Sequence, residues 1–399
     1  MSRRCVLENS PVHTFRIPFA IPFAGSIHRL TRVGLTLVLL SLGLGVSANE
    51  PDAGWELGPF VRPAEAAPII SPIKDALFDG TISSSPVHWE SLHTFNPGAI
   101  VRDQKIYLLY RAEDDSGKMK IGGHTSRIGL AVSEDGIHFQ REPKPVLYPT
   151  DDDQKAREWP GGCEDPRVVE AEDGTYVLAY TQWNHRRYDA AIATSKDLHT
   201  WKKHGPAFAK AYGGKYKNLQ YKSMGIGTRL QDGQLKIAKI NGKYLMYWGE
   251  GTIYLATSEN LVDWDPVEDK NGKLVAVLGR RLHRFDSWFP EVGPPPIVTE
   301  RGILLLYNGK NGLKDGDKNL TPKTYSVGEA LFSARNPAQL LQRTEQPVFK
   351  PELPWERSGQ YVAGTTFAEG LVYYQGKWFL YYGSADSLVG VATSEHPAL

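Results

Sequence analysis

A pair of short strand-like runs recurs five times along the chain, starting near residue 95. The first run of each pair is rich in aliphatic and aromatic residues and ends at a tyrosine, as in Lys105–Tyr110. The second run alternates apolar with small or polar residues and ends at a serine, as in Ile128–Ser133. Alternation of this kind indicates β-strands and not helices. The closing serines are Ser133, Ser195, Ser258, Ser333 and Ser394.

The spacing of these serines indicates how the strands are organised. Successive serines lie 62, 63, 75 and 61 residues apart, and a regular period of this length indicates stacked supersecondary units. Five such sheets arranged radially form a five-bladed β-propeller, which leaves only short, protected edges. A β-sandwich is less consistent with five copies at one spacing. Residues 312–321 account for the longest interval as an inserted loop.

The first 48 residues differ in pattern from the rest of the chain. Basic residues precede an apolar run over 33–46, and Val46-Ser47-Ala48 has the small residues that a signal peptidase reads. This pattern predicts an export signal over 1–48, a linker or N-terminal arm over 49–79 and the propeller over 80–399. The apolar run is short for a membrane span. We therefore expect a periplasmic or extracellular protein without stable membrane insertion, with a retained anchor as the alternative.

Composition and charge narrow the possible partners. The formal net charge is +1, so neither nucleic acid nor an anionic membrane surface is indicated. Of the two cysteines, Cys5 lies in the expected signal, which leaves Cys163 without an internal disulfide partner. No histidine is placed by motif to activate Cys163, so we expect a packed thiol. The sequence carries no signal for an oligomeric state.

The stretch 159–167, Trp-Pro-Gly-Gly-Cys-Glu-Asp-Pro-Arg, is the strongest candidate for chemistry. Its two glycines allow a backbone turn that other residues resist, and Pro166 is expected to hold Asp165 in an extended conformation. Arg167 can fix a carboxylate through a planar, two-pronged pairing. The stretch is typical of an acid group held at the mouth of a sheet, although a capped turn with a surface ion pair fits these residues equally.

Polar residues stand at similar places in the other repeats, near the start of each unit. In a propeller the inner strands converge on a central channel, so one or two polar residues from each blade would meet there. Several carboxylates at one axis repel one another unless some are protonated or bind a ligand. Such a set suits acid–base chemistry on a polyhydroxylated substrate. The candidates are Asn96, Arg111, Glu164, Asp165, Arg167, Glu250, Glu291 and Asp386.

An ordered set of motifs resembles glycoside hydrolase family 130 over about residues 80–399. The matching stretches are Asn96-Pro97-Gly98-Ala99, Tyr110-Arg111-Ala112, Ser126-Arg127-Ile128-Gly129-Leu130-Ala131, Ser133-Glu134-Asp135-Gly136, Glu164-Asp165-Pro166-Arg167, Gly293-Pro294-Pro295-Pro296-Ile297 and Tyr382-Gly383-Ser384-Ala385-Asp386. The resemblance implies a five-bladed propeller that acts on β-mannosides. Most members are inverting phosphorylases, and some are inverting hydrolases of β-1,2-mannosidic bonds. The resemblance also implies a mannose-containing oligosaccharide as substrate and no metal or organic cofactor.

The resemblance further implies roles for individual residues. Asp165 corresponds to the proton donor, thought to act through a sugar hydroxyl, and Glu164 or Arg167 would orient it. The residues implied to bind mannose hydroxyls are Asn96, Arg111, Arg127 and Asp386. All of these side chains are therefore expected near the channel.

Two positions bear on the choice between hydrolysis and phosphorolysis. The family's phosphorylases carry a histidine–arginine pair where this chain reads Tyr247-Trp248-Gly249-Glu250, and small residues where it has Glu291. Both changes put negative charge where phosphate would bind. The resemblance therefore favours an inverting hydrolase with Glu250 or Glu291 as the base. The sequence does not distinguish between these two glutamates.

Three alternatives stay open. A phosphorylase releasing mannose 1-phosphate is favoured by Lys236, Lys239 and the run 185–187, His-Arg-Arg, which could form a phosphate pocket. A sugar-binding propeller without turnover is disfavoured by the set of acids. A furanosidase or arabinanase of related architecture would place its acids elsewhere in the blades.

Overall fold

The computed structural model of this chain describes residues 54–397 and residue 399. The predicted export signal over 1–48 and the start of the predicted linker lie outside these residues. Strands dominate the described part, and its helical elements are four residues long each: α1 (Lys155–Glu158), α2 (Ala211–Gly214) and the 3-10 turn η1 (Pro354–Arg357). No described helix has the length and apolar character to cross a membrane. The prediction of an all-β chain is confirmed.

The strands are grouped into antiparallel meanders, in which a strand pairs with the one before it and the one after it. The first group is β3 (His93–Arg102), β4 (Lys105–Glu113), β5 (Ser126–Ser133) and β6 (Gln140–Arg141). The next is β7 (Gly162–Glu170), β8 (Tyr176–Trp183), β9 (Tyr188–Ser195) and β10 (Lys202–Pro206).

The C-terminal half continues the same arrangement. One group contains β11 (Met224–Ile226), β14 (Lys239–Ile240), β15 (Lys243–Trp248), β16 (Ile253–Ser258), β17 (Asp265–Pro266) and β18 (Ala276–Leu278). Another contains β19 (Phe289–Val292), β20 (Ile297–Val298), β21 (Ile303–Lys310), β22 (Tyr325–Phe332) and β23 (Leu340–Arg343). The last contains β24 (Thr366–Tyr374), β25 (Lys377–Ser384) and β26 (Leu388–Ser394). Two further pairs are short: β1 (Leu77–Phe78) with β2 (Val87–His88), which form a separate sheet, and β12 (Thr228–Gln231) with β13 (Gln234–Ile237), which lie between β20 and β7.

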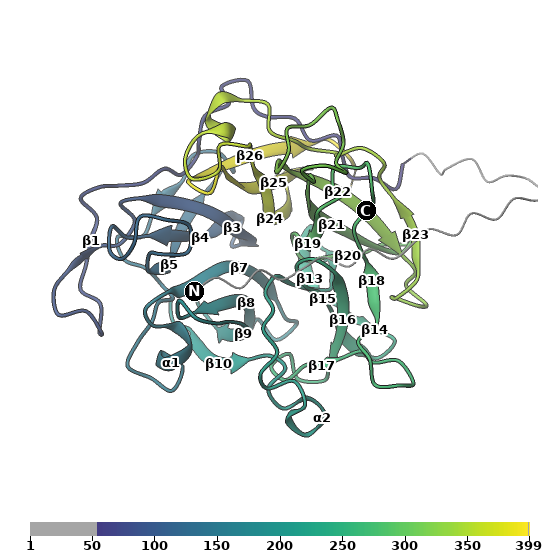
Figure 1. The fold of residues 1–399 in the computed structure, drawn as a ribbon, viewed down its shortest axis with the longest axis horizontal. Helices are drawn as coiled ribbons and strands as arrows, with labels where there is room; N and C mark the ends of the chain where they lie inside the picture. Colours follow the sequence, from purple (N-terminus) through teal and green to yellow (C-terminus); the bar gives the residue numbers. More distant parts are fainter. Residues whose placement is uncertain (1–53, 398) are drawn as a thin grey trace, which may run out of the picture. The chain divides into compact units, whose positions relative to one another are not determined.

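Single parallel bridges connect several of these groups into one hydrogen-bonded network. Ser126 in β5 is paired with Gly162 in β7, and Thr228 in β12 is paired with Ile297 in β20. Within residues 54–397, hydrogen bonding therefore runs through a sheet of 15 strands, beside sheets of six, three and two strands. Figure 1 shows the groups following one another around a common centre in chain order, with β3, β7 and β24 close to that centre.

The repeated tyrosines explain why this sequence pattern forms these sheets. Each tyrosine that ends a first run is buried, and its hydroxyl donates a hydrogen bond: Tyr110 to Glu90, Tyr180 to Glu158, Tyr247 to the Pro337 carbonyl, Tyr307 to Asp286 and Tyr382 to Glu356. For Tyr110 and Tyr382, a glycine on the neighbouring strand leaves room for the ring, because a Cβ at Gly129 would lie 2.4 Å from Tyr110 and one at Gly390 would lie 2.3 Å from Tyr382. A buried aromatic ring with a bonded hydroxyl stabilises each group in the same way.

Residues 54–70 lie along the last strand and are part of the same core. The backbone N–H groups of Leu57 and Gly58 donate to the Glu329 carboxylate at 2.9 and 3.1 Å. Val61 forms a backbone bridge with Thr393, and Leu57 is fully buried. The start of the described chain is therefore tied to its end.

Candidate active site

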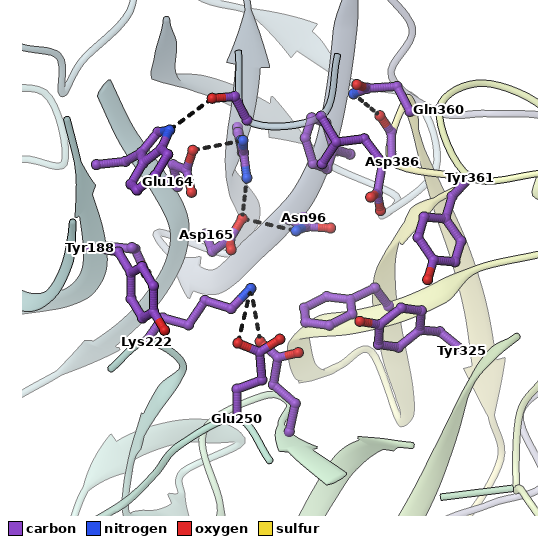
Figure 2. Close-up of a pocket in the computed structure, with 18 of the residues that line it drawn as sticks. Asn96, Glu164, Asp165, Tyr188, Lys222, Glu250, Tyr325, Gln360, Tyr361 and Asp386 are labelled. Atoms are coloured by element: carbon purple, nitrogen blue, oxygen red, sulfur yellow. Dashed lines mark hydrogen bonds and ion pairs between the residues drawn. The ribbon is translucent and has the colours of Figure 1, made fainter. Parts of the chain in front are cut away.

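The cavity that gathers most of the predicted site residues has a volume of about 460 Å³ (Figure 2). Seven of the nine predicted residues line it: Asn96, Arg111, Glu164, Asp165, Glu250, Glu291 and Asp386. Its lining contains six carboxyl groups, from Glu113, Glu164, Asp165, Glu250, Glu291 and Asp386, and three cationic side chains, from Arg111, Lys222 and Lys310. Carboxyl groups therefore outnumber cations around this space.

Irregular backbone brings two of these side chains to the cavity. The strand pairing shifts register between Phe95 and Pro97 in β3 and between Glu164 and Arg167 in β7. Asn96 and Asp165 lie within these bulges, with φ of 48° and 51°. Bulges beside active sites commonly re-aim a side chain, and positive φ in non-glycine residues is uncommon. The expectation that Pro166 keeps Asp165 extended is therefore wrong, because the bulge sets the local backbone.

Arg111 organises the carboxyl groups on one side of the cavity. Its Nη1 donates to Asp165 Oδ1 at 3.1 Å, and its Nη2 donates to Glu113 Oε1 at 2.6 Å and to Glu164 Oε1 at 2.8 Å. Asn96 Nδ2 adds a hydrogen bond of 2.9 Å to Asp165 Oδ1. A planar guanidinium holds several carboxylate oxygens in fixed directions, so this part of the site is pre-organised.

These contacts separate the acidities of two neighbouring carboxyl groups. Burial raises the pKa of Glu164 to about 7, although Arg111 opposes this effect. Burial also acts on Asp165, but Arg111, Lys222 and the Asn96 hydrogen bond outweigh it and lower the pKa of Asp165 below its ordinary value. A proton shared by this pair near neutral pH therefore resides on Glu164.

A second group of charges surrounds Lys222. Its Nζ lies 3.5 Å from Glu291 Oε1 and 3.8 Å from Glu250 Oε2, and Figure 2 shows Lys222 between Asp165 and Glu250. The two glutamates are adjacent because Glu250 and Glu291 form a backbone bridge. Burial raises the pKa of Glu291 to about 7, and the Glu250 charge adds to this rise while Lys222 opposes it.

The two glutamates differ in exposure and bonding. The Glu250 side chain is 30% exposed, whereas that of Glu291 is 1% exposed. The Ser223 hydroxyl donates to Glu291 Oε1, and Glu291 Oε2 has no hydrogen-bond partner within the described part of the chain. Water in the cavity can therefore reach Glu250 more readily than Glu291.

The remaining part of the cavity combines an acid with an aromatic cluster. Burial raises the pKa of Asp386 to about 6, and its backbone carbonyl accepts a hydrogen bond of 2.9 Å from Gln360. Lys310 Nζ lies 4.7 Å from the ring centres of Trp288 and Tyr325. Burial lowers the pKa of Lys310. Aromatic faces stabilise a nearby ammonium group, so the surrounding rings help to hold Lys310.

Two predicted site residues do not line the cavity. Arg127 donates to Asp114 at 2.6 Å in a buried ion pair. Its neighbour Ser126 faces Arg111, and because successive side chains of a strand point to opposite faces, Arg127 is directed away from the cavity. The expected contact of Arg127 with a sugar hydroxyl in this cavity is therefore not supported by the structure.

Arg167 acts as a brace between segments. Its Nε and Nη2 donate to the carbonyl oxygens of Gly293 and Val292 at 2.8 and 2.7 Å. Its Nη1 donates to the Asp165 carbonyl oxygen at 3.2 Å and lies 3.0 Å from buried Glu369. Arg167 therefore positions the backbone of Asp165, and Arg111 contacts the Asp165 carboxylate.

The other sequence expectations concern residues away from the cavity. Lys236 pairs with Glu170, and Lys239 lies 4.9 Å from the ring centre of Tyr244. Residues 185–187 are also absent from the lining, so the phosphate pocket considered for these cations is not assembled at this cavity. Cys163 is fully buried, and burial raises the pKa of its thiol well above the ordinary value. A buried thiol with such a pKa is inert packing.

Several lining residues escape sequence reasoning. Lys222 precedes the three-residue strand β11 and falls outside the repeated pattern. Lys310 ends β21, three residues after the repeated tyrosine Tyr307, and that position is a signal that could have identified it. The other unexpected lining residues include Trp183, Tyr188, Tyr325, Gln360 and Tyr361.

Comparison with known proteins adds an independent line of information. A family model described as beta-1,4-mannooligosaccharide phosphorylase matches residues 61–397. A 1,2-beta-oligomannan phosphorylase from Thermoanaerobacter sp. (strain X514) is 32% identical over 311 residues, which cover 77% of this chain and 91% of that protein.

Two solved structures are similar over most of the chain. One is described with the finding that glycoside hydrolase family 130 of mannoside phosphorylases contains glycoside hydrolases that target beta-1,2 mannosidic linkages in Candida mannan. It is 53% identical with a TM-score of 0.84, and the match covers 86% of this chain and 95% of that chain. The other is a glycosyl hydrolase from Bacteroides ovatus, 49% identical with a TM-score of 0.83, and the match covers 86% of this chain and 98% of that chain.

Proposed function

Because the chain belongs to glycoside hydrolase family 130, we propose that it is an inverting glycosidase that hydrolyses β-1,2-mannosidic bonds in oligosaccharides or glycans. The observation that carries hydrolysis over phosphorolysis is the charge of the cavity. Six carboxyl groups and three cationic side chains line it. A phosphate dianion would enter a space already rich in negative charge, whereas a neutral sugar and a water molecule would not be repelled.

We assign the role of acid to Asp165. It is buried, and Arg111 and Asn96 both bind its Oδ1 atom, which leaves Oδ2 for a sugar hydroxyl. Glu164 holds a proton close to neutral pH beside it, and a bound sugar that removes water raises the pKa of a buried carboxyl. On binding, this proton shifts from Glu164 to Asp165 Oδ2. Asp165 then gives it to the sugar hydroxyl while that hydroxyl gives its own proton to the glycosidic oxygen, as the bond from that oxygen to the anomeric carbon breaks.

We assign the role of base to Glu250 and a supporting role to Glu291. The attacking water must come from the cavity, and the Glu250 side chain is the more exposed of the two. Lys222 lies within 4.0 Å of both carboxylates and favours their ionised form. Glu250 takes one proton from the water as the water oxygen bonds to the anomeric carbon, on the face opposite the acid.

We also propose that the groups of strands are five blades of one propeller and that the protein is exported. Support for five blades is the repeated buried tyrosine, which occurs once in each of five antiparallel groups. Support for export is the basic and apolar pattern of residues 1–48, which precedes small residues at a cleavage position. Hydrolysis suits an exported enzyme, because conserving bond energy as a sugar phosphate is useful only where that product can enter metabolism.

The decisive experiment is incubation of the protein with β-1,2-mannobiose in the presence and absence of phosphate, followed by identification of the products. Free mannose at the same rate in both samples supports hydrolysis. The cations Lys222 and Lys310 favour the second candidate, a phosphorylase, in which mannose 1-phosphate would form only with phosphate. That product would overturn the proposal.

Glutamine variants identify the base in the same assay. Glu250→Gln should lose about 10²-fold or more in kcat, since general base catalysis is commonly worth that much. Azide is a nucleophile that needs no base, and it should restore turnover of Glu250→Gln by forming mannosyl azide. Glu259→Gln changes an exposed glutamate elsewhere and serves as the matched control. If azide restored turnover of Glu291→Gln and not of Glu250→Gln, Glu291 would be the base and Glu250 the supporting residue.

A further inference from the structure

We propose that His93, Glu113 and His124 form a binding site for a divalent transition-metal ion of the Zn²⁺ class. Their potential ligand atoms all lie within 4.8 Å of one another. His93 begins β3, Glu113 ends β4, and His124 lies just before β5. Three segments of the first sheet therefore bring two imidazoles and one carboxylate together at the same edge.

The hydrogen bonds of the two histidines leave one nitrogen of each ring available. His124 Nδ1 lies 2.9 Å from the Ser116 carbonyl oxygen. A carbonyl only accepts hydrogen bonds, so Nδ1 carries the proton and Nε2 carries the lone pair. His93 Nδ1 lies 2.9 Å from the Ser387 hydroxyl, which occupies that nitrogen. Metal-binding histidines typically have their second ring nitrogen bonded in this way, because the contact fixes the ring orientation.

The alternative is a set of ordinary buried histidines satisfied by their neighbours. Such histidines would be expected to bond to the nearby carboxylate, yet no hydrogen bond joins the three side chains among the contacts of residues 54–397. Glu113 Oε1 binds Arg111, and Glu113 Oε2 accepts only a long bond of 3.3 Å from Gln360. His124 and Glu113 are 2% and 1% exposed. Two buried side chains and the half-buried His93, with ligand atoms within 4.8 Å of one another, favour a shared ligand.

The surroundings provide access and space for an ion. A cavity of about 300 Å³ adjoins the cluster and is lined by His93, Met119, Lys120, Ile121, His124 and Gln360. Tetrahedral zinc with bonds near 2.0 Å needs ligand atoms roughly 3.3 Å apart. The ligand atoms must therefore move closer to one another when a metal binds. Lys120 and Arg111 oppose a cation, so binding requires the two neutral imidazoles as well as the carboxylate.

The donor set indicates the class of metal. Two imidazoles and one carboxylate suit zinc and neighbouring first-row ions, whereas calcium and magnesium prefer oxygen ligands. Three protein ligands leave at least one position for water. The two histidines lie outside the catalytic cavity, whereas Glu113 lines it, so the metal site would adjoin the catalytic cavity.

The proposed function gives the metal a consequence, and only this step rests on that function. Glu113 shares Arg111 with Asp165 and Glu164. A metal on Glu113 would draw its charge away from the guanidinium and add a cation nearby. Because Arg111 positions the acid, we expect an occupied site to lower turnover.

The test is a calorimetric titration of tag-free, chelator-treated full-length protein with ZnCl₂ at pH 7. We expect one equivalent to bind to the wild type. His93→Ala and His124→Ala should weaken binding at least tenfold, in line with the loss of a metal ligand. His138→Ala, which removes an exposed histidine of another turn, should leave it unchanged. Absence of stoichiometric binding, or equal binding by His124→Ala, would overturn the proposal.

A second measurement uses the wild type alone, so it does not require that any variant folds. Co²⁺ added to the wild type should give visible absorption of the intensity typical of four or five ligands, and zinc should abolish it. Absence of these bands would also overturn the site. Binding is measured without turnover, so a protein that binds zinc but fails to cleave mannobiose would sink the proposed function alone. Zinc inhibition of wild type but not of His124→Ala would establish the link between the two sites.

Discussion

One side of the cavity holds its carboxyl groups with an arginine, and the other holds them with a lysine. Arg111 donates separate hydrogen bonds to Glu113, Glu164 and Asp165 at 2.6–3.1 Å. Lys222 approaches Glu250 and Glu291 only to 3.8 and 3.5 Å. Directed hydrogen bonds and charge both fix the carboxyl groups around Arg111, whereas charge attraction is the main interaction between Lys222 and its two glutamates.

This difference matches the two tasks that we propose. An acid that works through a sugar hydroxyl must keep its carboxylate oxygen in one place, and a fork of N–H donors provides that precision. A base that receives a proton from water needs an accessible oxygen and a charge that keeps it ionised. The Lys222 ammonium group lies 3.8 Å from Glu250 and 3.5 Å from Glu291 and supplies that charge without short, directed hydrogen bonds to their oxygens.

Removal of the acid is the change with the largest expected effect. Asp165→Asn keeps the shape and the contacts to Asn96 and Arg111 but cannot give up a proton in the same way. We expect kcat on β-1,2-mannobiose to fall by ~10²–10⁴. Asp173→Asn, on an exposed turn, is the control and should behave as wild type. Turnover of Asp165→Asn near the wild-type rate would show that the arginine side does not hold the acid.

A lysine in place of Arg111 tests direction separately from charge. Arg111→Lys keeps one positive charge but cannot reach Glu113, Glu164 and Asp165 at once, so we expect kcat to fall by roughly 10- to 100-fold. Thermal unfolding should also occur at lower temperature, because breaking a buried ion pair costs about 3–5 kcal/mol.

The matched variant is Arg127→Lys, which alters a buried arginine that points away from the cavity. It should lose stability but retain kcat per folded molecule. Equal losses of kcat in the two variants would mean that the contacts of Arg111 with the acids have no special role.

Removal of the ammonium group tests the lysine side. Lys222→Met takes away the charge that opposes the raised pKa of Glu291, so this pKa should rise further above about 7. Because ionised Glu291 supports the base, the acidic limb of the pH profile of kcat/KM should follow this pKa to higher pH, with a loss of about tenfold near pH 6. Lys222→Arg should shift the limb much less, because it keeps the charge. An unchanged acidic limb in Lys222→Met would mean that the Lys222 charge does not control the ionisation that turnover requires.

The smallest expected effect is on stability in the absence of substrate. Burial raises the pKa of Glu164 and Glu291 to about 7 and that of Asp386 to about 6. Between pH 4.5 and 7 these groups bind more protons in the folded than in the unfolded state, so the free energy of unfolding falls as pH rises. The fall is on the order of a kcal/mol per group.

Urea unfolding at pH 5 and pH 7.5 measures this dependence. Glu291→Gln stays uncharged and should flatten it, at the cost of activity. Glu259→Gln should retain the wild-type slope, because Glu259 is exposed. A free energy of unfolding that rises across this range would contradict the pKa directions on which the comparison depends.

Much of the fold could be predicted from the sequence because its signals are local. Each first run ends at a buried tyrosine, and β5, β9, β16 and β26 end at a predicted serine, while Ser333 directly follows β22. The hydroxyl oxygens of Ser133, Ser195 and Ser258 accept hydrogen bonds from the backbone N–H groups two and three residues further along the chain. These hydrogen bonds form the turn that follows each strand. The pattern therefore reports both the strand and its end.

The site was predictable where residues belong to the repeat and unpredictable elsewhere. Asn96, Asp165 and Glu250 follow the repeated pattern, so their gathering could be expected. Lys222 comes from an irregular segment, and only the tertiary fold brings it to Glu291. Arg127 was misplaced because a motif does not tell which face of a strand a side chain occupies, whereas its pairing with Asp114 depends on that face.

The attachment of residues 54–61 to the end of the chain has a consequence for the order of events during synthesis. Leu57 and Gly58 bind Glu329, and Val61 pairs with Thr393. Glu329 lies 272 residues after Leu57, and Thr393 lies 332 residues after Val61, so this early segment must wait until those stretches are made before it can dock. Closing so long a loop depends on the rest of the fold being in place. A truncation that removes residues 54–61 should therefore disturb this last docking step and leave the formation of the other sheets unaffected.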